Sequence, residues 1–186
     1  MAGDLARVEA ELIDSVRSGD DFLTEISSHL IAAGGKRVRP GFCIAAAATA
    51  LTVDAPAGAA AVTGGVAVEL VHLGSLYHDD VMDEAELRRG APSANARWDN
   101  TVAILTGDFL FSRASDLLAD LGPEAVRIQA QTFSRLVIGQ IKETVGPGEG
   151  DDPFDHYLAV VADKTGSLIA TSGRFGAMMS GATPEV

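Results

Sequence analysis

The stretch AAAVTGGVAVELVHLGSLYHDDVMD, residues 59–83, is an apolar run that ends in a cluster of carboxylates. Alanine and leucine dominate the apolar part of the chain and favour helices over sheets, so we expect one long helix from about Ala59 to Asp83 or beyond. Asp79 and Asp83 are four residues apart, and on a helix they project from one face, one turn apart. Asp80 points about 100° away and can bond partners behind that face. The stretch therefore predicts a long helix that presents two carboxylates at one end.

Charged residues at this helix end indicate a site for metal ions and phosphates. Two carboxylates one turn apart repel each other by roughly 0.2–0.5 kcal/mol on an open helix, and a divalent cation between them reverses the sign. Oxygen ligands select Mg²⁺, with Mn²⁺ as the alternative, and Mg²⁺ combines one or two carboxylates with phosphate oxygens. Arg88 and Arg89 follow in the sequence, and guanidinium groups match phosphate geometry. A solvated acidic helix end is the competing interpretation, but the paired arginines favour the site.

A second basic cluster lies in GGKRVRP, residues 34–40. Its cations are Lys36, Arg37 and Arg39. Backbone amides freed by the two glycines can also reach an anion. Basic residues that complement the dipole at a helix C-terminus are the alternative, but three cations in four positions exceed that need. His72 lies two helical turns before Asp79 on nearly the same face, so it points along the aspartate stripe.

The bulk composition predicts one soluble cytoplasmic domain over residues 1–186. Hydrophobic residues make up 47% of the chain, which is enough for a core, and the formal net charge of −12 argues against nucleic-acid binding. The single cysteine, Cys43, excludes an internal disulfide. The N-terminus lacks a continuous apolar segment typical of a signal peptide. The most apolar run is interrupted by Glu69, His72 and His78, so we expect no membrane span and at most transient membrane contact.

The rest of the chain is predicted to be helices joined by short loops, without useful strand-like alternation. Besides the long helix, we expect helices over residues 5–17, 21–33, 41–53, 101–121, 123–145 and 153–180. Asp20 or Asp21 is expected to cap the second of these helices. The segment RRGAPSANARWDN, residues 88–100, is predicted to be a loop. The fold class is therefore all-α, a bundle of core-facing helices.

Several motifs, taken in order, closely resemble trans-isoprenyl diphosphate synthases of the long-chain polyprenyl type. The resemblance runs from about residue 25 to the C-terminus and rests on GGKRVRP, LVHLGSLYHDDVMDEAELRRGAPSANARW, AILTGDFLF, GQIKE and KTGSL. It implies the isoprenoid synthase helical fold. Such enzymes ionise an allylic prenyl diphosphate with Mg²⁺, couple the carbocation to isopentenyl diphosphate and lose a proton. The resemblance also implies a homodimer formed by the helices around AILTGDFLF and the one after it.

The resemblance assigns roles to the residues at matching positions. Asp79 and Asp83 would bind the Mg²⁺ ions on the allylic diphosphate, where metal and arginine stabilise a departing polyanion. The residues expected around the allylic diphosphate and its cavity are Arg88, Gln140, Lys164 and Thr165. The residues expected to hold isopentenyl diphosphate are Lys36, Arg39, His72 and Arg89. The expected catalytic set is Asp79, Asp83, Arg88, Lys164 and Thr165.

Product length is predicted from the turn of helix before Asp79. In the family that this chain resembles, bulky aromatic residues at this level form the floor of the prenyl tunnel. Gly74 and Ser75 occupy the level here, which implies an open floor and a long product. Close helix packing at these small residues is the alternative, and both can hold.

One departure from the family pattern concerns its second aspartate-rich motif, which lies on a later helix. This chain ends at GATPEV before that motif is expected. The segment DDPFD, residues 151–155, has a sequence similar to that motif, but Pro153 is incompatible with a helix interior. We expect Asp152 to cap a helix with Pro153 at its first position. The expectation is a bundle truncated before the second motif, with apolar surface left for other helices.

Four functions compete for this sequence. The first is a prenyltransferase that makes a long-chain trans-polyprenyl diphosphate. The second is a non-catalytic prenyl-diphosphate-binding subunit or an inactive fragment. The third is a terpene cyclase, which has no use for the basic clusters of an isopentenyl diphosphate site. A purely structural helical protein leaves those clusters unexplained.

Overall fold

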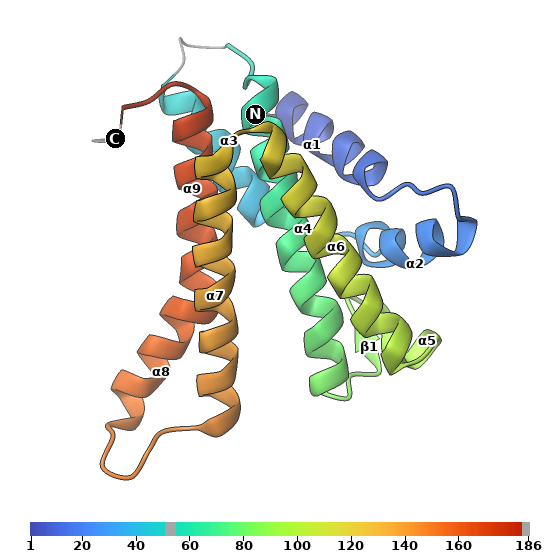
Figure 1. Cartoon of the computed structure of the whole chain (residues 1–186), viewed down its shortest axis with the longest axis vertical. Coiled ribbons are helices and arrows are strands. Elements are labelled where there is room, and N and C mark those ends of the chain that lie inside the picture. Colours follow the sequence, from blue (N-terminus) through green and yellow to red (C-terminus); the bar gives the residue numbers. More distant parts are fainter. Residues whose placement is uncertain (51–54, 184–186) are drawn as a thin grey trace.

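The computed structural model describes residues 1–50 and 55–183, which form a bundle of helices (Figure 1). The helices are α1 (Ala2–Ser15), α2 (Asp21–Ala32), α3 (Val38–Thr49), α4 (Ala59–Met82), α5 (Ala94–Arg97), α6 (Asn100–Asp120), α7 (Pro123–Val145), α8 (Pro153–Val161) and α9 (Ser167–Met179). A π-helical turn, η1 (Ala162–Gly166), joins α8 to α9. The all-α prediction is confirmed. The expected end of the third helix near Val53 lies outside the described residues.

Helix α4 is the centre of the bundle and packs against α1, α3, α6 and α9. Most of its residues between Ala61 and Gly74 are buried, which is why its sequence is apolar on all sides. Close packing continues between α3 and α9 because Gly176 has no side chain. A Cβ atom at Gly176 would lie 1.9 Å from the carbonyl oxygen of Cys43. Helices α3, α4 and α9 therefore pack closely together beside the site.

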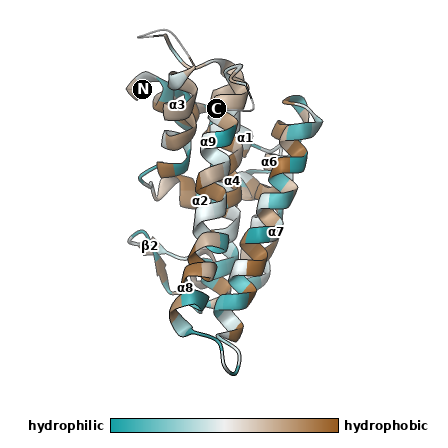
Figure 2. Ribbon diagram, turned by 90° about the vertical axis from the view of Figure 1, so that its left-hand side faces the viewer, coloured by the Kyte–Doolittle hydropathy of each residue, from teal (hydrophilic) through white to brown (hydrophobic). Residues whose placement is uncertain are grey.

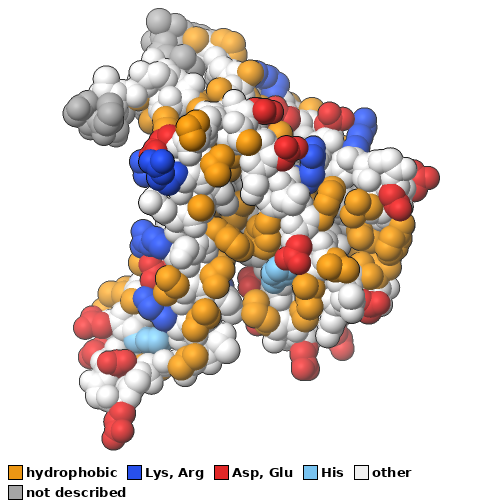
Figure 3. Space-filling model, in the orientation of Figure 1, with side chains coloured by type: hydrophobic (Ala, Val, Ile, Leu, Met, Phe, Trp, Pro, Cys, Tyr) orange, Lys and Arg blue, Asp and Glu red, His pale blue; other side chains and the backbone are white. Residues whose placement is uncertain are grey.

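The helices separate into two groups toward one end of the molecule. Figure 1 shows α7, α8 and α9 diverging from α4 and α6, and the space-filling view is hollowed between the two groups (Figure 3). Figure 2 shows brown, hydrophobic segments along α6 and α7. The candidate site lies where α4, α7 and η1 face one another.

Three helices begin at aspartates whose side chains accept hydrogen bonds from backbone amides. Asp20 accepts from Leu23 N at 2.9 Å at the start of α2, and Asp99 does the same at the start of α6. Asp152 accepts from Phe154 N at 2.8 Å, with Pro153 at the first position of α8. The predicted caps at Asp20 and Asp152 are confirmed.

One prediction about local structure was wrong, and another missed a detail. The expected loop at residues 88–100 holds strands β1 (Leu87–Arg88) and β2 (Ala91–Pro92), which pair antiparallel, and then the short helix α5. The turn between the strands uses Gly90 at φ +81°, a conformation that glycine adopts readily. The expected helix at residues 153–180 is confirmed in extent, because helical structure runs from Pro153 to Met179, but a π-turn, η1, lies within it, and π-turns often occur at functional sites. Elements this short leave little periodic signal in a sequence.

Helix α4 is also long and apolar enough to cross a membrane, by length and composition alone. This differs from the expectation that Glu69, His72 and His78 break the apolar run. Of its most apolar 18-residue window, 67% is buried inside the fold. A core helix passes the same test, so the burial accounts for the composition.

Candidate active site

The carboxylates of Asp79 and Asp83 lie at the C-terminal end of α4. Asp83 is exposed and ends the helix, and its backbone N–H donates to the carbonyl oxygen of Asp79 at 2.8 Å. Asp79 is half-buried, and burial raises the pKa of its carboxyl group. The charges of Asp83 and Glu143 raise this pKa further, while Lys164 and Arg88 oppose the shift. The ionised pair is therefore strained electrostatically and suits a cation.

Asp80 is turned away from this pair, as predicted, and binds Arg88. Its side chain is fully buried, and Arg88 Nε donates to its Oδ1 at 2.6 Å. The second carboxylate oxygen, Oδ2, is buried without a partner. Arg88, which the resemblance assigns to the allylic diphosphate, is thus held close enough to Asp79 to lower the pKa of that residue.

A cavity of about 180 Å³ brings together six of the predicted site residues. They come from α3, α4 and η1, which are far apart in the sequence. The predicted residues that line it are Arg39, His72, Ser75, Asp79, Lys164 and Thr165. Leu76 and Leu136 supply its apolar wall. The sequence motifs therefore converge on one hollow beside the carboxylate pair.

The electrostatics of this cavity favour an anion. Burial lowers the pKa of His72 to about 3, and the charges of Arg39, Arg89, Arg88 and Arg37 lower it in the same direction. The imidazole is therefore neutral at physiological pH. Burial also lowers the pKa of Arg39, whose Nε atom is buried without a partner. A buried, unpaired guanidinium N–H beside a cavity is suited to a phosphate oxygen.

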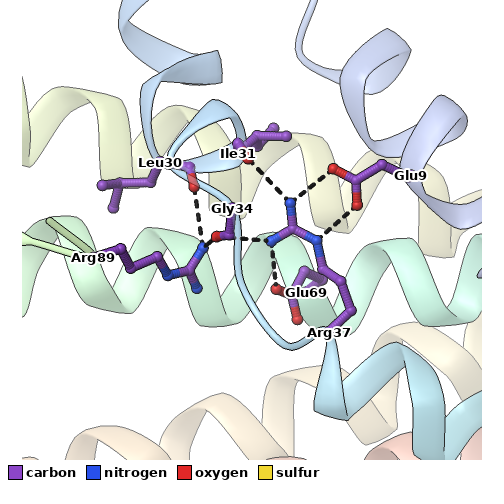
Figure 4. A network of polar contacts seen from close by, with 7 residues as sticks. All are labelled: Glu9, Leu30, Ile31, Gly34, Arg37, Glu69 and Arg89. Carbon is purple, nitrogen blue, oxygen red and sulfur yellow. Dashed lines mark hydrogen bonds and ion pairs between the residues drawn. The ribbon is translucent and has the colours of Figure 1, made fainter. Parts of the chain in front are cut away.

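Arg37 in the GGKRVRP segment has a structural role (Figure 4). Its guanidinium donates to both carboxylate oxygens of Glu9, at 2.7 and 2.8 Å, and to the buried carboxylate of Glu69 at 3.2 Å. It also donates to the carbonyl oxygen of Ile31 at 3.1 Å. Arg37 itself has φ +46°, a left-handed conformation that these contacts stabilise. The network fixes the loop that precedes Arg39.

Arg89 also contacts this loop. Its guanidinium donates to the carbonyl oxygens of Leu30, at 3.1 Å, and Gly34 (Figure 4). It passes so close to Gly35 that a Cβ there would lie 2.8 Å from Nη1 of Arg89. The predicted role of Arg89 with isopentenyl diphosphate stays a prediction, since its donors face backbone here. Lys36 is exposed and outside the cavity lining, and its predicted role also stays a prediction.

The π-turn η1 presents Lys164 and Thr165 to the cavity. Asp163 accepts from Arg135 Nη2 at 2.9 Å and from Lys142 Nζ at 2.8 Å, so α7 holds the turn at two points. Between these points lies Gly139, where a Cβ would sit 2.5 Å from the backbone nitrogen of Lys164. The backbone of the turn therefore rests directly on α7.

A second cavity of about 250 Å³ opens on the other side of Asp79 and Ser75, between α4, α6 and α7. The predicted residue Gln140 lines it, and its Oε1 atom is buried without a partner. Ser75 lines this cavity, and its predicted role in product length stays a prediction. Gly74 instead packs on α6, since a Cβ there would lie 2.9 Å from the ring of Phe111. Gly74 therefore allows close helix packing, and its predicted role in product length stays a prediction.

This convergence of motifs matches a known family. The family model described as "Polyprenyl synthetase" covers residues 20–186. The chain belongs to the polyprenyl synthetase family. The predicted isoprenoid synthase fold is confirmed by solved structures with the same arrangement of helices.

Relatives of this polyprenyl synthetase chain extend beyond it. The nonaprenyl diphosphate synthase of Mycobacterium tuberculosis is 53% identical over 181 residues, which cover 97% of this chain and 53% of that protein. The heptaprenyl diphosphate synthase component 2 of Geobacillus stearothermophilus is 41% identical over 187 residues, which cover 100% of this chain and 57% of that protein. The crystal structure of a decaprenyl diphosphate synthase from Rhodobacter capsulatus has a TM-score of 0.89 at 34% identity, covering 98% of this chain and 55% of that one. The chain spans about half the length of these relatives.

One charged residue beside the candidate site was not predicted from the sequence. Glu143 follows Gln140 by three residues in the motif GQIKE, one helical turn away on α7. It pairs with Lys164 and lies close enough to Asp79 to raise the pKa of that carboxyl group. The helical spacing from Gln140 was the available signal.

Proposed function

We propose that this chain binds an allylic prenyl diphosphate and isopentenyl diphosphate for their Mg²⁺-dependent condensation to a long-chain trans-polyprenyl diphosphate. The observation that carries the proposal is the cavity that places Arg39, His72 and Lys164 beside Asp79. These residues offer hydrogen-bond donors for phosphate oxygens and a carboxylate for a cation. The curated relatives named as polyprenyl diphosphate synthases support the same activity.

The donor set fits Mg²⁺. Asp79 and Asp83 offer two carboxylates one helical turn apart, and among the described residues no three His, Cys, Asp or Glu side chains gather to form a metal site. Mg²⁺ typically takes one or two carboxylates and completes its shell with water and substrate phosphates. When bound there, it would neutralise the negative charge that develops on a departing diphosphate.

The side chains around the cavity would position the substrates. Arg39 and Lys164 come from different elements and would hold phosphate oxygens through charged hydrogen bonds. Lys164 is paired with Glu143 in this structure and would exchange that partner for the diphosphate. Leu76 and Leu136 line the same cavity and would exclude water from the reacting carbon atoms.

The exposed apolar residues of α6 and α7 support a homodimer. Ile104 and Leu105 of α6 and Ile138 and Ile141 of α7 are between 43% and 61% exposed, and Figure 3 shows hydrophobic side chains on this face. Exposed apolar surface of this kind is typical of an interface. Analytical ultracentrifugation of a dimer would give twice the molecular mass of the monomer. The monomer mass at all protein concentrations would contradict the dimer.

We also propose a cytoplasmic location with transient membrane contact for product release, which fractionation of cells would test.

A second candidate is a subunit that binds prenyl diphosphates without turning them over. One relative is named component 2 of a heptaprenyl diphosphate synthase, which indicates an enzyme with more than one component. This chain covers 57% of that relative.

An extension assay separates the two candidates. The purified chain is incubated with Mg²⁺, farnesyl diphosphate and labelled isopentenyl diphosphate, and products are resolved by chromatography. Extension by the wild type but not by Asp79→Asn supports the synthase. Binding of farnesyl diphosphate without extension supports the subunit. If the chain neither binds nor extends farnesyl diphosphate, both candidates are contradicted.

A further inference from the structure

The hairpin formed by β1 and β2 carries Arg88 and Arg89 but is too short to hold its own shape. Each strand has two residues, and a single two-stranded hairpin is at best marginally stable in water. Arg89 and Gly90 form its turn with φ values of +55° and +81°. Arg89 therefore has a left-handed conformation that costs free energy unless surrounding contacts hold it. The position of both arginines depends on what the hairpin binds.

One side of the hairpin is fixed to the end of α4. Arg88 donates to the buried carboxylate of Asp80, and the backbone N–H of Ala85 donates to the carbonyl oxygen of Asp80 at 2.9 Å. Asn95, which follows β2, donates through Nδ2 to the carbonyl oxygen of Ala85 at 3.1 Å. These bonds involve α4 and not α2, so they fix Arg88 independently of α2.

The other side of the hairpin rests on the C-terminal part of α2. Arg89 donates to the carbonyl oxygens of Leu30, at 3.1 Å, and Gly34. His29, the residue before Leu30, contacts the carbonyl oxygen of Pro92 through Nε2 at 2.8 Å. Both bonds of Arg89 use its Nη1 atom. A diphosphate that took over this atom would leave β2 bound to α2 through His29.

The imidazole of His29 is held in one tautomer and one orientation. A carbonyl oxygen only accepts, so Nε2 carries the proton and donates to Pro92. Nδ1 accepts from Nη1 of Arg97 at 3.3 Å, since a guanidinium only donates. The ring of Trp98 packs edge-on against the imidazole at 5.1 Å, and Arg97 lies over the same indole at 4.4 Å. Residues at the end of α5 thus aim Nε2 of His29 at β2.

We propose that His29 is a positioning residue that holds the hairpin against α2 and so keeps Arg89 aimed at a second diphosphate. The inference rests on the proposed function, because it takes Arg89 to bind isopentenyl diphosphate. His29 is outside the lining of the cavity beside Asp79, so it acts through the carbonyl group of Pro92. Arg88 is fixed from α4 instead. The loss of His29 should therefore weaken the binding of isopentenyl diphosphate more than the binding of pyrophosphate with Mg²⁺ beside Asp79.

Calorimetric titration of isopentenyl diphosphate tests this role. The chain is first saturated with Mg²⁺ and inorganic pyrophosphate, so that the carboxylate pair is occupied and the titration reports the second diphosphate. His29→Leu removes the donor, and His29→Asn keeps an amide that is too short to reach Pro92. His29→Gln places an amide N–H near the position of Nε2 and should restore the bond.

The expected effect is that of one hydrogen bond. We expect His29→Leu and His29→Asn to bind isopentenyl diphosphate about fivefold more weakly than the wild type, or about 1 kcal/mol. His29→Gln should stay within about twofold of the wild type, or about 0.4 kcal/mol. The affinity of all three variants for pyrophosphate with Mg²⁺ should also stay within about twofold of the wild type.

A matched control separates positioning from a general loss of stability. Ser28→Ala removes a hydrogen bond within α2, from Oγ to the carbonyl oxygen of Thr24 at 2.6 Å, and leaves the hairpin contacts intact. It should not change the affinity for isopentenyl diphosphate. Circular dichroism checks that each variant is folded, and His29→Asn serves as the loss variant if His29→Leu does not fold.

Three results would overturn the role of His29. They are an unchanged affinity of the folded loss variants for isopentenyl diphosphate, an equal loss for both ligands, and a loss in His29→Gln as large as in His29→Asn. Failure of the wild type to bind isopentenyl diphosphate beside pyrophosphate would instead overturn the proposed function itself.

Discussion

The guanidinium of Arg88 binds the fully buried carboxylate of Asp80, with Nε donating to Oδ1 at 2.6 Å. Asp80 precedes the metal-site candidate Asp83 by three residues and follows Asp79 directly, yet it serves a different purpose. It faces the protein interior and holds β1 against the end of α4. Neighbouring aspartates of one motif thus divide into a structural group and a ligand-binding pair.

This division predicts that two alanine substitutions differ strongly in their effect on stability. Asp80→Ala leaves the half-buried Arg88 guanidinium without its carboxylate, which should lower the free energy of unfolding by about 1–3 kcal/mol. Asp83→Ala removes an exposed carboxylate and should change it by less than about 0.5 kcal/mol. Urea unfolding of both variants measures the difference. If both variants lost the same free energy of unfolding, Asp80 would not have the structural role assigned to it.

Asp79→Asn should stabilise the ligand-free chain while removing Mg²⁺ binding. Burial raises the pKa of Asp79, so the stability linked to its proton is present below the unfolded value of 3.8 and is lost as the pH rises through the folded pKa. At neutral pH the wild type has therefore lost the stability that the protonated Asp79 provides, and it is further destabilised by the repulsion between Asp79 and Asp83. Removing the repulsion alone is worth about 0.2–0.5 kcal/mol. Thermal unfolding at pH 7 without metal should show a higher melting temperature, and a lower one would contradict the electrostatic account.

His72 should make the chain less stable in mild acid. Burial lowers its pKa to about 3, whereas the unfolded value is 6.5. The stability from the neutral imidazole is present above pH 6.5 and is lost as the pH falls toward 3. One proton gives a slope of at most about 1.4 kcal/mol per pH unit. His72→Gln should remove this slope in urea unfolding between pH 7 and pH 5, while His156→Gln should keep it.

The contact between Gly139 and the π-turn predicts a loss of anion binding without a charge change. Gly139→Ala would place a Cβ 2.5 Å from the backbone nitrogen of Lys164 and push the turn away from α7. The affinity for pyrophosphate with Mg²⁺ should fall about tenfold, or about 1.4 kcal/mol. Gly173→Ala on α9 is the matched control, because a Cβ there meets nothing within 4 Å. Equal affinity in the Gly139 variant and the wild type would mean that the turn does not position Lys164.

Motifs with helical spacing were predictable from the sequence. The register of α4 placed Asp79 and Asp83 on one face and turned Asp80 away, and helix caps such as Asp152 follow from local hydrogen bonding. The role of Arg37 was not predictable, because its partner Glu69 lies 32 residues away. The π-turn at Lys164 depends on Gly139 of another helix, and such contacts leave no periodic trace in a sequence.

The central claim concerns an anion and a cation that bind together at the end of α4. Isothermal titration of inorganic pyrophosphate into the wild-type chain, with Mg²⁺ and then with EDTA, tests it most directly. The account predicts binding only with Mg²⁺, and its loss when Asp79 and Asp83 are both changed to asparagine. Binding of equal affinity in the double variant, or in EDTA, would contradict the account.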